Sequence, residues 1–204
     1  MDDRIKSAFE IAMEKAAKLE KLSPEEVLRM KWVPEGERLA ALYLRGDSDL
    51  SKMMKSIERS AFPYVLRGMI SVLAANITLP RSEAALTANQ RALDAFRLLC
   101  KDGKTLSAIA GRVTNVQEQY AGYGRQLLER SYNELKQRFT EQVQQQLKKQ
   151  GIPASQVKVD IESMPEFQSQ WRATASRIEQ QYEQHLEEFR QQLKELVLSR
   201  PASF

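Results

Sequence analysis

Apolar side chains recur every three or four residues along most of the chain, the spacing of a helix face that packs on a core. The longest run extends from Lys104 to Gln150 without a proline. Its apolar positions first follow a heptad repeat: Leu106, Ile109, Val113, Val116, Tyr120, Tyr123 and Leu127. The repeat then changes phase and continues with Leu128, Tyr132, Leu135, Phe139, Val143 and Leu147. Steps that alternate between three and four residues are typical of a coiled-coil seam, so we expect one long helix here.

A second run of the same kind occupies the end of the chain, from about Ser163 to Leu198. Its seam positions are Trp171, Ala175, Ile178, Tyr182, His185 and Phe189. Neither seam can be left in water, and a short connection joins the two runs. The sequence therefore predicts a long antiparallel helical hairpin, coiled-coil-like, over residues 104–204, with an extended connector at about 151–163.

The first part of the chain, residues 1–103, is divided more often and predicts five or six short helices. An apolar stripe predicts a helix over residues 2–21, and Ser23 with Glu26 forms a capping box for the next helix, to about Lys31. Pro34 is expected to open another short helix, which Gly46 closes. The fold class is therefore all-α: a compact helical domain over residues 1–103, followed by a protruding hairpin.

Later helices of this domain show the same one-sided pattern. The segment after Pro80 is the clearest example and ends before the "KDG" at residues 101–103. Its stripe is Leu86, Leu93, Phe96 and Leu99. We expect all four side chains to face one core.

Residues 157–161 depart from this helical pattern, because Val157, Val159 and Ile161 alternate with charged residues as in a half-buried strand. In one interpretation the segment is a surface connector whose apolar side chains cover the end of the hairpin. In the other it is an exposed edge that pairs with a second subunit or with the sheet of a partner. These three residues are the candidate partner contacts.

Two glycines, Gly122 and Gly124, lie inside the expected long helix, where each costs about 1 kcal/mol relative to alanine. Close packing of another helix would explain them. A hinge that lets the hairpin move is the functional alternative, so both are candidate hinge residues.

The net charge of +4 and the pI of about 9.1 suggest an anionic partner. The excess lies in residues 104–150, with eight basic and four acidic side chains, whereas residues 151–204 have six and eight. Pairing of the two helices would match much of this charge internally. Arg125, Arg130 and Arg138 alternate with tyrosines and are the candidate nucleic-acid contacts, but the tyrosines lie on the seam and are expected to be buried.

The residues of catalytic chemistry are sparse. The chain has one cysteine, Cys100, and one histidine, His185, too few for a standard zinc site or a nucleophile with its base. We expect Cys100 to be a small buried side chain and predict no catalytic residue, cofactor or metal. The N-terminus has no apolar signal region, and the longest apolar stretch, residues 61–80, is interrupted by Arg67. We expect a cytoplasmic protein without a membrane span.

Three segments, "MDDRIKSAFEIAMEKAAKL", "WVPEGERLAALYL" and "NITLPRSEAALTANQRALDAF", together resemble a family of uncharacterised bacterial helical proteins. The resemblance covers mainly residues 1–100 and implies a bacterial cytoplasmic origin and no activity.

The expected function is that of a non-enzymatic interaction or scaffold protein, whose hairpin mediates self-association or partner binding. The alternative is a nucleic-acid-associated protein that uses the basic face of residues 104–150.

Overall fold

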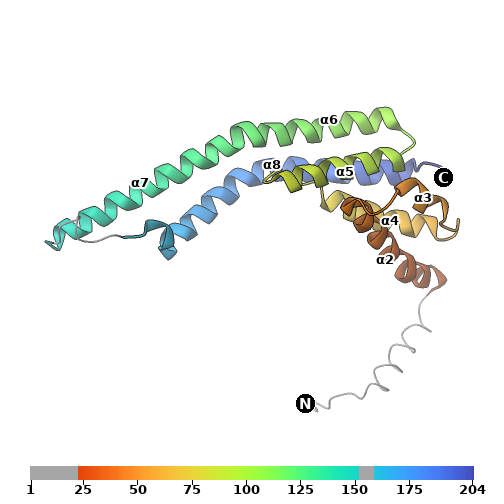
Figure 1. The fold of residues 1–204 in the computed structure, drawn as a ribbon, viewed down its shortest axis with the longest axis horizontal. Coiled ribbons are helices and arrows are strands. Elements are labelled where there is room, and N and C mark those ends of the chain that lie inside the picture. The colour runs from red at the N-terminus through yellow and green to blue at the C-terminus, as the bar shows by residue number, and fades with distance from the viewer. Residues whose placement is uncertain (1–22, 152–158) are drawn as a thin grey trace, which may run out of the picture. The chain divides into compact units, whose positions relative to one another are not determined.

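The computed structural model describes residues 23–151 and 159–204, and all regular secondary structure in these ranges is helical (Figure 1). The all-α prediction is thereby confirmed. The elements are α2 (Pro24–Arg45), α3 (Leu50–Lys55), α4 (Phe62–Ala75), α5 (Glu83–Leu99), α6 (Gly103–Gln119), the π-helical turn η1 (Tyr120–Gly124), α7 (Arg125–Lys149), the 3-10 turn η3 (Ile161–Ser163) and α8 (Pro165–Ser199). The helix expected over residues 2–21 and candidate contact Val157 lie outside the described residues.

The chain forms two compact units. Unit 1 contains residues 1–76, 91–103 and 194–204, and unit 2 contains residues 77–90 and 104–193. This grouping differs from the expected boundary at residue 103, because α5 and α8 each contribute to both units. The division into two domains at that boundary stays a prediction.

Both ends of α2 follow the sequence signals. The Ser23 hydroxyl accepts a hydrogen bond from the Glu26 amide at 3.3 Å, and the Glu26 carboxylate accepts one from the Ser23 amide at 2.7 Å. At the other end Gly46 has a φ of 91°, a left-handed conformation that glycine adopts without strain. The capping box and the closing glycine are confirmed.

The interior of α2 corrects one prediction. Pro34 does not open a new helix, because it lies inside a single helix of 22 residues. A proline in this position removes one backbone hydrogen bond and costs about 3 kcal/mol or more. The helix continues because the following turn, at Gly36, packs directly on α4.

Two glycines allow α2 and α4 to approach closely within unit 1. A Cβ atom on Gly36 would lie 2.0 Å from the carbonyl oxygen of Val65, and one on Gly68 would lie 2.0 Å from that of Val33. Each glycine therefore faces the backbone of the opposite helix, at the range where Cα–H groups contact carbonyl oxygens. Backbone packing, rather than interlocking side chains, sets this crossing.

In unit 2, η1 interrupts the regular helix between α6 and α7. A π-helical turn holds one more residue than an α-helical turn, so the side chains that follow are rotated around the axis. Tyr120 and Gly124 are buried, whereas Tyr123 is 68% exposed. The prediction that Tyr123 lies in the buried seam is therefore wrong, and the π-helical turn explains why the seam changes phase after Tyr120.

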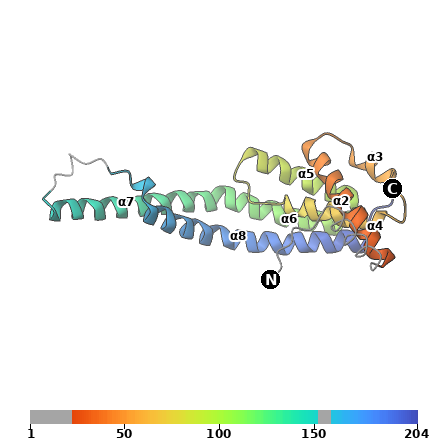
Figure 2. The ribbon, with the colours of Figure 1, turned by 90° about the horizontal axis from the view of Figure 1, so that it is seen from below.

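α8 packs beside η1 and α7 in unit 2 (Figures 1 and 2). Ring centroids are 5.4 Å apart for Tyr120 and Tyr182, 5.0 Å for Tyr132 and Trp171, and 5.5 Å for Phe139 and Phe167. Along this series of contacts the residue number rises in η1 and α7 and falls in α8.

His185 is exposed on α8, and its neighbour Leu186 is buried instead. The expectation that the imidazole packs in the seam is wrong. A straight helix turns once every 3.6 residues, so a strict seven-residue stripe drifts around its surface. By the end of α8 the buried line has moved to Leu186, Leu193 and Val197.

Candidate interaction site

The segment from Ile77 to Arg81, between α4 and α5, is irregular backbone held by side chains of unit 2. Asn89 bonds both sides of Thr78: its carbonyl accepts from the Thr78 amide at 2.6 Å, and its amide donates to the Thr78 carbonyl at 3.0 Å. Gln117 of α6 also donates to the Thr78 carbonyl, at 3.0 Å. Asn89 and Gln117 are buried, so these bonds satisfy polar groups that would otherwise lack partners.

Two arginines hold the same segment at its ends. Arg190 of α8 donates to the Ile77 carbonyl at 2.7 Å and also contacts Glu183 and Glu187. Arg125 of α7 donates to the Pro80 carbonyl. Charged donors make strong hydrogen bonds, so α7 and α8 together fix the path of this connection.

Arg81, Glu179 and Tyr120 form a part-buried network beside it. Arg81 donates two hydrogen bonds to the Glu179 carboxylate, at 3.0 and 2.7 Å, and the Tyr120 hydroxyl donates a third at 2.7 Å. The bonds from Arg81 lower the pKa of Glu179 below its usual value of 4.5. Burial raises the pKa of Tyr120, and its hydrogen bond to Glu179 raises it further.

We expect Glu179 to make the protein sensitive to acid. A carboxyl group with a lowered pKa in the folded chain stabilises the fold above its unfolded-state pKa, and this contribution is lost as the pH falls through the folded-state pKa. The free energy of unfolding should therefore fall more steeply below pH 4.5 in the wild type than in Glu179→Gln. Urea unfolding at a series of pH values measures this.

Glu134→Gln is the control for this comparison, because Glu134 is an exposed carboxylate of α7. Its pH profile should follow that of the wild type. Parallel profiles for the wild type and Glu179→Gln over the whole acid range would contradict the assignment.

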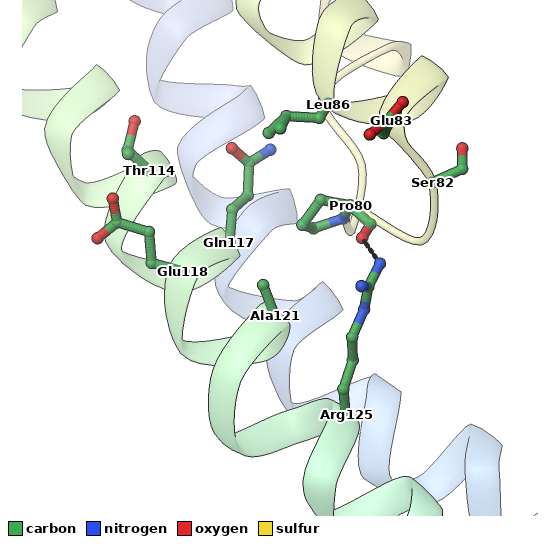
Figure 3. A pocket seen from close by; sticks show the side chains of 9 residues that line it. All are labelled: Pro80, Ser82, Glu83, Leu86, Thr114, Gln117, Glu118, Ala121 and Arg125. Carbon is green, nitrogen blue, oxygen red and sulfur yellow. Dashed lines mark hydrogen bonds between the residues drawn. The ribbon is translucent and has the colours of Figure 1, made fainter.

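A groove opens beside the anchored segment, within unit 2 (Figure 3). It has a volume of about 370 Å³. Its lining residues come from the anchored segment, α5, α6, η1 and α7: Pro80, Ser82, Glu83, Leu86, Thr114, Gln117, Glu118, Ala121 and Arg125. Figure 3 shows Glu118 and Glu83 on opposite sides, with Gln117, Leu86 and Pro80 between them.

Leu86 is 54% exposed, although the sequence stripe predicted that it faces the core with Leu93, Phe96 and Leu99. That prediction is wrong for Leu86 alone, because the other three side chains are buried. The first turn of α5 lies beside the groove, so its apolar side chain lines an open surface. A large apolar side chain beside two carboxylates gives the groove the composition of a binding surface.

The two candidate hinge residues have different surroundings in η1. A Cβ atom on Gly124 would lie 2.9 Å from Tyr120 Cδ2 and 3.3 Å from Tyr182 Cε2, whereas one on Gly122 would meet nothing within 4 Å. Close packing of the tyrosine rings accounts for Gly124. A hinge at Gly122 and Gly124 stays a prediction, now located at a π-helical turn, which is a frequent feature of functional sites.

Two of the candidate partner contacts, Val159 and Ile161, differ in their exposure to solvent. Val159 is exposed, whereas Ile161 begins η3 and is buried. The cluster around Ile161 contains Leu135, Phe139 and Phe167. Residues 159–161 form no strand, and Ile161 packs against the middle of α7 and the first turn of α8. Partner binding by Val157, Val159 and Ile161 stays a prediction, with Val159 as the described side chain that is open to solvent.

The candidate nucleic-acid contacts also differ among themselves. Arg125 is engaged with the Pro80 carbonyl, whereas Arg130 and Arg138 are exposed on α7. Three acidic residues of α8 pair with arginines outside this candidate set. Glu179 pairs with Arg81, and Glu183 and Glu187 pair with Arg190.

An aromatic cluster joins α7 and α8 and is only partly covered. Phe167 is 2% exposed, but Tyr132 and Trp171 are half-buried. These three rings line a depression of about 430 Å³, together with Gln168 and the charged residues Glu162 and Arg172. The depression is an open surface of unit 2 with partly exposed aromatic rings.

Several kinds of chemistry find no support in the described ranges. Residues 23–151 and 159–204 contain no group of three or more His, Cys, Asp or Glu side chains placed to hold a metal. In the same ranges no helix combines the length and apolar character needed to cross a bilayer. Cys100 is buried, as predicted, and burial raises the pKa of its thiol, which disfavours the reactive thiolate.

The residues that anchor the 77–81 segment are not among those predicted from the sequence. A signal was present, because Asn89 and Gln117 are polar residues at positions of the apolar stripes. Asn89 lies three residues after Leu86, and Gln117 lies four after Val113. A polar side chain on a core-facing stripe needs a buried partner. Glu179 and Arg81 gave no such signal, because the sequence does not distinguish them from the charged residues on exposed helix faces.

Comparison with known proteins finds one relationship. No curated protein and no solved structure matches the chain at a significant level. A family of unknown function matches residues 51–195 and so includes α3 to α7 and most of α8. Of the three segments that carried the resemblance, "NITLPRSEAALTANQRALDAF" lies in this range. The match spans well over half of the chain, which therefore belongs to the family of unknown function DUF6657.

Proposed function

We propose that the chain is a non-enzymatic interaction or scaffold protein. In this proposal α6, η1 and α7 pair with α8 as a long antiparallel, coiled-coil-like hairpin that associates with a second copy. The ring contacts between Tyr120 and Tyr182 and between Phe139 and Phe167 support such a pairing. A cytoplasmic location belongs to the same proposal and rests on the single cysteine of the chain.

The incomplete cover of the α7–α8 aromatic cluster is the observation that carries this proposal. Tyr132 and Trp171 meet edge to face with ring centroids 5.0 Å apart, but remain half-buried beside an open depression. Two helices can enclose only the line between them, so large side chains at its edge stay in contact with water. A second pair of helices would cover these rings and bury their apolar area, which favours association.

The charge distribution supports a second copy as the occupant of this surface. Residues 104–150 have eight basic and four acidic side chains, and residues 151–204 have six and eight. In a two-fold assembly the first long helix of one hairpin can lie against α8 of the other, with opposite net charges in contact. At the rim of the depression Glu162 is paired with Lys136 of the same copy, whereas Arg172 is exposed and can reach a carboxylate of the second copy.

Light scattering on the full chain tests the proposal. The wild type should give a mass of at least twice 23.4 kDa at tens of micromolar, and Trp171→Glu should shift it toward the monomer, because a charge cannot be buried there unpaired. Leu98→Glu is the matched control, since Leu98 is an exposed apolar residue of unit 1.

Circular dichroism on the same samples shows whether Trp171→Glu keeps its helices. Arg172→Glu provides a second variant, because it changes the rim without touching the ring stack. A clean 23.4 kDa monomer of the wild type would overturn self-association.

Nucleic-acid binding through Arg125, Arg130 and Arg138 is the alternative function, and no observation on the described residues favours it. The bond from Arg125 to Pro80 reduces the set of free cations on this face. The carboxylates of Glu129, Glu134 and Glu141 are interspersed among the basic residues of α7. A phosphate backbone is bound best by an uninterrupted basic surface, so the interaction role is preferred.

A further inference from the structure

The chemistry of the groove beside residues 77–81 indicates which kind of molecule it can bind. We infer that it binds a basic amphipathic segment of a partner protein, in which an apolar side chain lies on Leu86, Pro80 and Ala121 and flanking Lys or Arg side chains reach Glu83 and Glu118. The inference goes beyond the proposed self-association, because the partner it names is a different protein. It uses a surface separate from the aromatic cluster.

Leu86 supplies the main apolar surface of the groove. This side chain is 54% exposed in a helix whose other stripe residues, Leu93, Phe96 and Leu99, are buried. Pro80 and Ala121 add apolar surface to the same groove. An apolar side chain placed here would remove this surface from water.

The charged side chains at the rim of the groove indicate which residues should flank the apolar side chain of the bound segment. In the described part of the chain, the Glu83 and Glu118 carboxylates have no hydrogen-bond or ion-pair partner, and Figure 3 places them on opposite sides of the groove. Arg125, which also lines the groove, is engaged with the Pro80 carbonyl. The free charges of the rim are therefore negative, and a segment with basic residues on both sides of its apolar residue is complementary to them.

The groove is fixed in shape before any partner binds. Gln117 of its lining donates to the Thr78 carbonyl, and Arg125 donates to the Pro80 carbonyl. These bonds tie the anchored segment to α6 and α7, so less ordering is required on binding. The volume of about 370 Å³ is at the small end of ligand pockets and suits one or two side chains rather than a whole helix.

A titration with two synthetic peptides tests the inference on the full chain. The probe is a fluorescein-labelled amphipathic peptide of leucine and lysine, and its counterpart contains glutamate in place of lysine. We expect saturable binding of the lysine peptide by anisotropy, no comparable binding of the glutamate peptide, and a shift of the Leu86 methyl signals in NMR spectra.

Variants locate the binding surface. Glu83→Gln combined with Glu118→Gln should weaken binding about tenfold, the sum of two exposed ion pairs. The matched control is Glu129→Gln with Glu134→Gln, which makes the same change in net charge on exposed positions of α7. Leu86→Ser should also weaken binding, and because Leu86 is largely exposed the fold should persist.

Several results would overturn the inference. Equal weakening by both double variants would show attraction by overall charge rather than by the groove. Unmoved Leu86 methyl signals, or equal binding of the glutamate peptide, would also overturn it. Concentration-dependent shifts of Leu86 without peptide would identify a second copy as the occupant instead of a different protein. Self-association is tested by light scattering on a Trp171 variant, whereas the groove is tested by peptide binding to Glu83, Glu118 and Leu86 variants. Failure of one proposal can therefore be distinguished from failure of the other.

Discussion

Gly68→Ala should lower the free energy of unfolding by about 3 kcal/mol, at the upper end of the range for overpacked cores. The new Cβ atom would lie 2.0 Å from the Val33 carbonyl oxygen and 2.9 Å from the Glu37 amide nitrogen. Both atoms belong to the backbone of α2, so no side-chain rotation can relieve the contact. The α2–α4 crossing must open, and buried side chains around it lose their packing.

Gly111→Ala is the matched control for this substitution. Gly111 lies in α6, and a Cβ atom there would meet nothing within 4 Å. Alanine should therefore raise the free energy of unfolding by about 0.5–1 kcal/mol, because it has the higher helix propensity. Urea unfolding followed by circular dichroism measures both variants. A Gly68→Ala protein as stable as the wild type would disprove the close crossing.

Phe167→Ala should destabilise the packing of α7 on α8 by about 3–5 kcal/mol, the range for a buried phenylalanine. The ring is 2% exposed and contacts Tyr132 and Phe139, each with centroids 5.5 Å away. It is the central side chain of the cluster that also holds Leu135 and Ile161. Its loss removes the contacts that hold these neighbours together.

Hydrogen exchange is the suitable measurement for Phe167→Ala, because the opening can be local. Amides of α7 near Phe139 should exchange faster, while those of α4 in unit 1 should keep their protection. Phe204→Ala makes the same chemical change at a 40% exposed ring of unit 1, which contacts Phe62, and should leave exchange in α7 unchanged. Unchanged exchange in α7 would show that the cluster does not hold the two helices together.

The predictions that succeeded depend on local chemistry. The capping box of Ser23 and Glu26 and the left-handed Gly46 form from residues adjacent in sequence, so short-range signals sufficed. The long apolar runs likewise predicted the helices of the second half. The prediction failed at Pro34, where a local rule was overridden by packing of Gly36 on another helix.

The candidate sites were less predictable, for a related reason. Ile161 appeared as part of a strand, but its side chain is buried by α7 and α8. The groove was not foreseen at all, because Leu86, Glu118 and Arg125 come from three elements and share no motif. Side chains that meet only in the folded chain leave no signal in their spacing.

By itself, the sequence determined that this protein is helical, where most of its helices start and stop, and which runs need a packing partner. Only the tertiary structure decided which of those apolar positions are covered. The π-helical turn at Tyr120–Gly124 rotates the buried face of the first long helix. The buried face of α8 shifts from His185 to Leu186, and Leu86 stays exposed to solvent beside the anchored segment. The physical reason is that helix formation depends on neighbours a few residues away, whereas burial depends on the contacts made between elements distant in sequence.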